Sequence, residues 1–195
     1  GTTEIAEGLF AGCTGIEQIT IPDTVTVIES GAFGGCINLK EITVPDNVTE
    51  IQRSAFEYCS SLKTAKLSEN LKSIGIWAFG DCNVLKSIKI PDSVTDIDGN
   101  AFAECKELSD VILSKNLKTM GWQVFGNDNK LTEIEIPKSL EECRYSVNSA
   151  GIDGGAFDNC ANLKTVTFEE GTTEIAEGLF AGCTGIEQIT IPDTV

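Results

Sequence analysis

The sequence predicts a β-rich solenoid of about eight coils, and three observations carry this prediction. Phenylalanine recurs every 23 residues from Phe10 to Phe125 and returns at Phe157 and Phe180. A cysteine follows most of these phenylalanines by three residues, and an aliphatic residue or methionine precedes each of them by five, with Ile152 taken for the seventh. Each unit then closes on a short segment such as "ITIP" or "ITVP". Units this short cannot bury their apolar side chains alone, so they must stack into one continuous core.

Apolar residues alternate with polar ones in the closing segment, as they do in a half-buried strand. Stacked in register, these segments predict one parallel sheet along one face, with strands about 4.8 Å apart. The prolines at several strand ends lack the N–H needed for a ladder bond and turn the chain. The "GAFGGC" segment (31–36) is too short for an independent helix, so we expect one helical turn or a 3₁₀ piece in each coil.

Two units depart from the pattern. We call the positions that recur in every unit ladder positions. Asp128 takes the place of the ladder cysteine in the sixth unit, where we expect a locally wetter turn. The seventh unit is lengthened by nine residues, which we place within 141–151, with the regular pattern resuming at Ile152. Cys143 would then lie in a polar insertion, and we expect it to be the most exposed thiol.

The chain reads as one solenoid domain, 1–195, and is interpreted as a fragment of a longer tandem array. Residues 1–25 and 171–195 are identical, including their solvent positions, and packing cannot enforce such a match. Recent duplication of a 170-residue unit explains the identity, and deliberate engineering is the alternative. The expected repeats lie near 1–25, 26–48, 49–71, 72–94, 95–117, 118–140, 141–172 and 173–195.

Composition excludes several classes of function. The net charge of −16 disfavours nucleic-acid binding, because a polyanion would be repelled. No apolar run is long enough for a membrane span, and no signal segment is present in these residues. The absence of histidine removes the commonest general base and the commonest metal ligand.

The pattern Ile-x3-Ala-Phe-x2-Cys-x2-Leu-x2-Ile-x-Ile-Pro, seen in "VIESGAFGGCINLKEITVPDNV" (27–48), resembles the BspA-like class of leucine-rich repeats. The resemblance covers the chain apart from the insertion, and it implies a right-handed leucine-rich-repeat solenoid. It also implies a secreted or cell-surface protein that adheres to a protein ligand, such as a host extracellular matrix or cell-surface protein. The family has no catalytic residues, so the resemblance implies no enzyme and no cofactor.

Four chemical roles are possible for residues of these types: disulfides, a zinc site, a calcium site and nucleophilic catalysis. Ladder cysteines point in parallel, which is poor disulfide geometry, so we expect buried free thiols. Zinc is disfavoured because the chain has neither CxxC pairs nor Cys/His clusters. Asp96, Asp98 and Asn100 hint at a calcium loop, but the EF-hand pattern fails beyond them. No histidine is available to activate a serine or cysteine, so an enzyme is not expected.

Candidate interaction residues occupy the variable, solvent-facing positions. The outward positions of the strand face are small, polar and mixed in charge, and the candidates among them are Thr43, Lys66, Lys89 and Ile112. The positions before the phenylalanine carry Ile76, Trp77 and Trp122, which could form an apolar patch two coils apart, and tryptophan is enriched in binding hot spots. Tyr58 and Tyr145 are weaker candidates of the same kind. The alternative is that each indole folds down over the edge of the core.

The sequence is compatible with two functions. The first is an adhesive, protein-binding module that presents the extended solenoid face. The second is a structural spacer or rod in a large surface protein, assembling end to end. Neither end carries a polar capping repeat, so we also expect head-to-tail self-association or fraying of the terminal coils.

Overall fold

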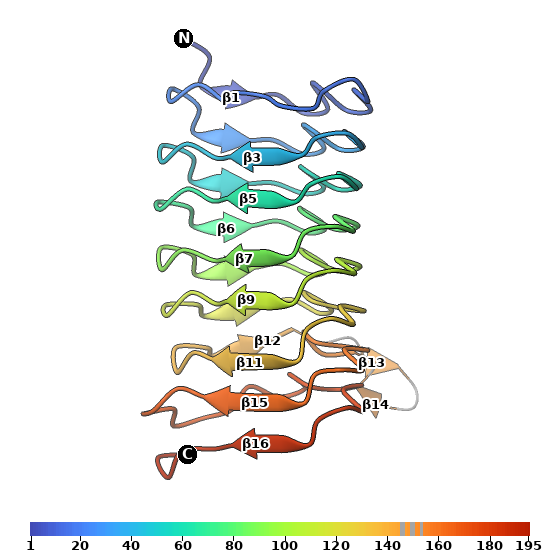
Figure 1. Ribbon diagram of the computed structural model, residues 1–195. Helices are drawn as coiled ribbons and strands as arrows, with labels where there is room; N and C mark the ends of the chain where they lie inside the picture. The colour runs from blue at the N-terminus through green and yellow to red at the C-terminus, as the bar shows by residue number, and fades with distance from the viewer. Residues whose placement is uncertain (145–146, 149–150, 153) are drawn as a thin grey trace.

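The chain forms a parallel β-solenoid of eight stacked coils, as the sequence predicts (Figure 1). The computed structural model describes the backbone of residues 1–144, 147–148, 151–152 and 154–195, and the side chains of 1–144 and 154–195. None of these described residues lies in a helix. Successive coils repeat the same path, so each contacts its two neighbours.

The closing segments form the predicted parallel strands on the front face in Figure 1, which we call the strand face. Their alternation places one side chain inward between two outward ones, as in Glu41–Thr43, where Ile42 is buried. The strands of this face are β3 (Glu41–Thr43), β5 (Thr64–Lys66), β7 (Ser87–Lys89), β9 (Asp110–Ile112), β11 (Glu133–Ile136), β15 (Thr165–Phe168) and β16 (Gln188–Thr190).

A second parallel sheet, which the sequence did not predict, runs along the opposite face. It consists of two-residue strands that carry the aliphatic ladder residue, such as Ile28 and Ile51, in direct register. Its strands are β1 (Glu4–Ile5), β2 (Val27–Ile28), β4 (Glu50–Ile51), β6 (Ser73–Ile74), β8 (Asp96–Ile97), β10 (Thr119–Met120) and β12 (Glu142–Cys143). Inward side chains from both sheets, such as Ile42 and Ile28, form the core between them.

The expected helical turn or 3₁₀ piece is absent from the described chain, and turns take its place. Most coils have a left-handed residue two positions before the phenylalanine, as at Gly31, and another two positions after it, as at Gly35. These positive φ values interrupt any helical run, and glycine adopts them without a steric penalty. Trp77 (φ 59°) and Tyr58 (φ 61°) hold the same two positions without being glycine.

A continuous phenylalanine stack runs through the core. Neighbouring rings from Phe10 to Phe180 lie 5.0–5.5 Å apart between centroids, with interplanar angles of 3–19°. The six rings from Phe33 to Phe157 are fully buried. This spacing matches the separation of parallel strands, so one ring per coil fills the centre without a gap.

Two details of the predicted insertion were wrong: Cys143 does not belong to it, and the regular pattern does not resume at Ile152. Cys143 pairs with Met120 in the seven-stranded sheet and is only 4% exposed, so it occupies the aliphatic ladder position of the seventh coil. The extra residues therefore follow Cys143, and they include an antiparallel pair of β13 (Val147–Asn148) with β14 (Gly151–Ile152). Ile152 pairs with Val147 rather than continuing the parallel sheet.

Truncating the stack at its centre should cost far more than truncating it at its end. Phe79→Ala removes a fully buried ring and should lower the free energy of unfolding by about 3–5 kcal/mol. Phe10→Ala should cost less, because Phe10 is only partly buried and stacks on a single neighbour. Urea denaturation of both variants and the wild type measures the difference. Equal losses in the two variants would contradict the stacking account.

Candidate functional site

The sequence-predicted site residues separate into two surfaces. Thr43, Lys66, Lys89 and Ile112 end consecutive strands of the strand face and form one exposed row. The register places Thr43 beside Lys66 and Lys89 beside Ile112. Ile76, Trp77 and Trp122 lie instead in the turns that precede the phenylalanines. Tyr145 lies outside the described residues.

The strand face is built from groups of coils rather than from one uninterrupted ladder. β3 pairs with β5, β7 pairs with β9, and β11, β15 and β16 form a third group. In Figure 1 the front arrows stand in these groups. β5 and β7 remain in contact although no ladder pairing joins them, and the same holds for β9 and β11. We call these two boundaries the β5/β7 seam and the β9/β11 seam.

Turn chemistry distinguishes the coils on the two sides of each seam. Coils three and five end on Ser68 and Ser114, where coils two, four and six have proline. Ser68 is fully buried and donates its hydroxyl to the carbonyl of Val48, one coil back, at 2.6 Å. Ser114 donates in the same way to Val94. The alternation of proline and serine at the strand ends was visible in the sequence. It coincides with the grouping of the strands, which the sequence analysis did not predict.

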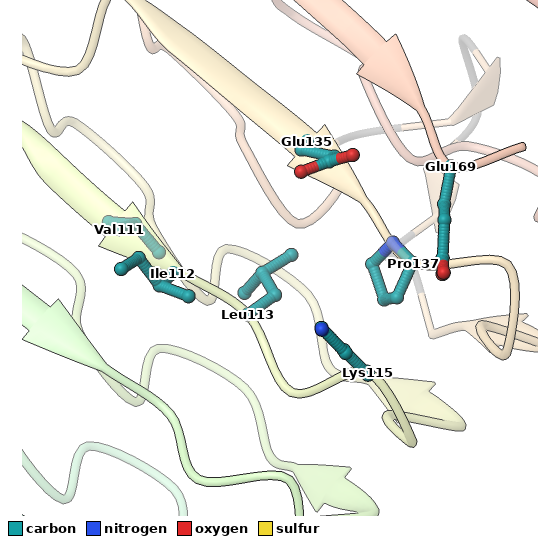
Figure 2. Close-up of a pocket in the computed structure, with 7 residues that line it drawn as sticks. All are labelled: Val111, Ile112, Leu113, Lys115, Glu135, Pro137 and Glu169. Atoms are coloured by element: carbon teal, nitrogen blue, oxygen red, sulfur yellow. The ribbon is translucent and has the colours of Figure 1, made fainter.

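A shallow hollow of about 310 Å³ lies at the β9/β11 seam. Figure 2 shows Ile112 and Leu113 from the β9 side, with Glu135 and Pro137 from the β11 side. Ile112 is 54% exposed, in a column where the other coils carry threonine, lysine or glutamate. The hollow is lined by Val111, Ile112, Leu113, Lys115, Glu135, Pro137 and Glu169. It offers an apolar contact with charged groups around it.

Both tryptophans lie against glycines of the turn edge. The indole of Trp77 covers Gly80 in its own coil, and the indole of Trp122 covers Gly99 of the preceding coil. The Trp77 amide in turn donates to the carbonyl of Gly99 at 3.2 Å. Trp122 remains 40% exposed, and Tyr58 on the same edge is 55% exposed. We call Tyr58, Trp77 and Trp122 the aromatic edge.

The ladder cysteines contribute to packing rather than to a reactive site. All eight cysteines are free, as expected. In six coils the thiol donates to the phenylalanine carbonyl of the coil before it, as from Cys59 to Phe33 at 3.3 Å. Burial raises the pKa of the Cys59 thiol to about 12. Because the thiolate is the nucleophile, these groups are unreactive in the folded chain.

The expected wetter turn at Asp128 was wrong. Asp128 is fully buried in the cysteine slot, because that slot lies inside the stack whatever residue occupies it. Neither carboxyl oxygen has a hydrogen-bond partner within the described chain. Burial raises the pKa of this carboxyl well above its usual range, and the negative charge of Glu104 raises it further.

The acidic residues of the suspected calcium loop have other partners. Asp96 accepts hydrogen bonds from the hydroxyls of Thr119 and Thr95, and these bonds lower the pKa of its carboxyl. Asp98 pairs with Arg144 at 3.3 Å. Over the described residues there is no group of three or more histidine, cysteine, aspartate or glutamate side chains placed to hold a metal ion.

The pattern of the BspA type leucine rich repeat region matches residues 3–131 and 140–195, in six copies. The chain belongs to this family. Its members are generally non-enzymatic interaction scaffolds. The comparison with curated proteins finds no match. In the part of the chain that the structure describes, no helix is long and apolar enough to span a bilayer.

Solved structures of bacterial leucine-rich repeat proteins resemble the chain over nearly its whole length. A leucine-rich repeat protein from Bacteroides ovatus is 28% identical with a TM-score of 0.67, over 99% of this chain and 65% of its own. A leucine rich cell surface protein from Faecalibacterium prausnitzii is 27% identical with a TM-score of 0.56, over 99% of this chain and 58% of its own. The chain therefore spans less than two thirds of both proteins.

Alkylation should distinguish buried from accessible thiols. In the native protein, iodoacetamide should modify Cys13 first, because it is only partly buried in the first coil. Cys143 and the fully buried ladder cysteines should react only after unfolding, since burial raises the pKa of Cys143 and of its ladder counterparts. Peptide mass spectrometry after timed quenching measures each rate. Rapid native modification of Cys143 would contradict its place in the core.

Asp128 should make stability fall as pH rises. The folded-state pKa lies above the unfolded value, so the folded chain keeps a proton that the unfolded chain has lost. The free energy of unfolding should therefore decrease by up to about 1.4 kcal/mol per pH unit above pH ~4 until Asp128 ionises. Asp128→Cys and Asp128→Asn should both lack this decrease. Urea denaturation at pH 5 and pH 8 compares the three proteins, and identical pH dependence in all of them would refute the account.

Proposed function

We propose that this chain is a protein-binding module of a secreted or cell-surface bacterial protein, acting by adhesion rather than catalysis. The proposal rests on one observation: buried positions hold nearly the same residues in successive coils, whereas exposed positions differ. Phenylalanine and cysteine positions repeat almost without change, whereas the outward strand positions change from coil to coil. Solenoids use such extended faces for recognition through many weak contacts.

The location is supported by what the chain resembles. The similar protein from Faecalibacterium prausnitzii is described as a cell surface protein. A host extracellular matrix or cell-surface protein is the kind of ligand that such a location makes available. The cysteines are free, so the fold does not depend on disulfide formation.

Two surfaces are available for this binding: the strand face and the aromatic edge. Tryptophan and tyrosine supply a large contact area at low entropic cost, which makes the aromatic edge the stronger anchor. A rod-like spacer is the second candidate function, and the straight stack of coils in Figure 1 favours it. A spacer requires no exposed aromatic residues, so these residues distinguish the two.

Replacing the aromatic anchors should separate these functions. Trp77→Ala with Trp122→Ala should weaken binding to immobilised fibronectin or fibrinogen by tenfold or more, roughly the effect of losing one hot-spot residue. Surface plasmon resonance measures the affinity, and circular dichroism checks that the fold is retained. If the wild type binds and the double variant binds equally tightly, the aromatic edge is excluded as the binding surface. If the wild type binds neither fibronectin nor fibrinogen, the spacer function is favoured.

A further inference from the structure

Four lysines gather on the strand face at the β5/β7 seam, in a chain whose net charge is −16. Lys63 directly precedes β5 and Lys66 ends it, while Lys86 and Lys89 hold the same positions around β7. All four are exposed. Stacked coils lie about 5 Å apart, so like charges sit side by side, which destabilises neighbouring strands. We call these four residues the lysine cluster.

The charge of the lysine cluster is largely uncompensated. Elsewhere in the same columns, Lys40 pairs with Glu17 of the preceding coil, and Lys164 pairs with Glu187 of the following one. Within the described chain, the cluster makes a single ion pair, between Lys89 and Glu69 at 4.0 Å. Both partners of that pair are more than half exposed, so the contact contributes little.

An acidic group stands on the same face beyond the lysine cluster. Asp110 begins β9, and Glu133 and Glu135 project outward from β11. All three are exposed, and the described residues supply no ion pair to any of them. Ile112 ends β9, which lies between β7 of the lysine cluster and β11 of Glu133 and Glu135. Figure 2 shows the hollow beside Ile112, with Glu135 on its far side. The strand face therefore runs from basic through apolar to acidic.

We propose that the strand face binds an extended segment of a partner protein in which an acidic run and a basic run flank an apolar side chain. This inference rests on the proposed function and names its partner chemistry. The acidic run lies over the lysine cluster, the apolar side chain enters the hollow at Ile112, and the basic run lies over Glu133 and Glu135. Three coil steps separate Lys66 from Glu135, or about 14 Å, which an extended chain spans in roughly four residues.

Other occupants fit this face less well. A long polyanion following the solenoid axis would leave the lysine cluster and meet Glu41 on one side and Asp110 on the other. A second copy could oppose its lysines to these acids, but each copy brings a net charge of −16, which repels the other. A segment of mixed charge meets a complementary group at each end, and like-charge contacts reject other sequences.

Synthetic peptides test the charge order directly. The probe has an acidic run, a central leucine and a basic run, and its control has the same composition with alternating charges. We expect the probe to bind the wild type at low salt several-fold more tightly than the control, and to weaken as salt is added. Titration of the ¹⁵N-labelled chain should shift the amides around Lys66, Lys89 and Ile112.

Matched variants assign the binding to this face. Lys66→Glu with Lys89→Glu should weaken probe binding by about tenfold. Lys72→Glu with Lys118→Glu makes the same change of net charge near the opposite sheet and should leave binding unchanged. Adding Glu133→Lys and Glu135→Lys to the first pair restores the net charge and inverts the charge order. Binding should recover, because an extended peptide can lie in the opposite direction.

The outcomes separate this inference from the proposed function. Equal affinity for probe and control, or no loss in Lys66→Glu with Lys89→Glu, would overturn the inference. Tighter binding of a heparin oligosaccharide than of the probe, lost in the same variant, would overturn it in favour of a sulfated polysaccharide. Dimerisation that the variant abolishes, seen by analytical ultracentrifugation, would overturn it in favour of a second copy. Wild-type binding to fibronectin or fibrinogen without probe binding would leave the protein-binding function standing and remove only this assignment.

Discussion

The in-register stacking of one phenylalanine per coil is the constraint on which the rest of the structure depends. Rings 5.0–5.5 Å apart require each coil to repeat the height and orientation of the last. The cysteine ladder reinforces this, because each ladder thiol that donates a hydrogen bond reaches the phenylalanine carbonyl of the preceding coil. The backbone, aromatic and thiol ladders thus repeat with the same translation from one coil to the next. A residue that changes this translation would disturb all three ladders together.

This constraint explains which features the sequence could reveal. A position that must superimpose on its neighbours repeats in the sequence, so the phenylalanine, cysteine and strand positions were predicted correctly. The left-handed positions were hidden, because glycine marks them in coil two whereas Trp77 and Tyr58 occupy equivalent positions later. The second sheet was missed for another reason. Its strands are two residues long, below the length at which alternation becomes visible.

The errors at Cys143 and Asp128 share a physical origin. Both residues were judged by their chemistry and their neighbours in sequence, whereas the slot in the stack decides their burial. Cys143 follows Met120 by the same 23 residues that separate the other ladder positions, and that spacing alone would have placed it correctly. Asp128 shows that a coil tolerates a buried carboxyl in this slot when its neighbours keep the register.

The grouping of coils links the fold to recognition. Where a turn carries serine in place of proline, its hydroxyl joins the coil to the one before it, and the next strand stands outside that ladder. The hollow at Ile112 lies at such a seam, and so do the facing lysines of coils three and four. The seams that separate these groups of exposed side chains thus follow the coils in which serine replaces proline.

A stack of this kind constrains what its surface can recognise. Each coil contacts only its neighbours, so an exposed residue can change without disturbing the core, and the coil spacing fixes the distance between surface groups. The stacked coils cannot close around a partner in the way that a mobile loop can. In the proposed binding mode, selectivity comes from the order of charged and apolar groups along the axis. Mechanical extension and binding are compatible in such a molecule, because the stacking that keeps the rod straight also holds the recognition pattern at constant spacing.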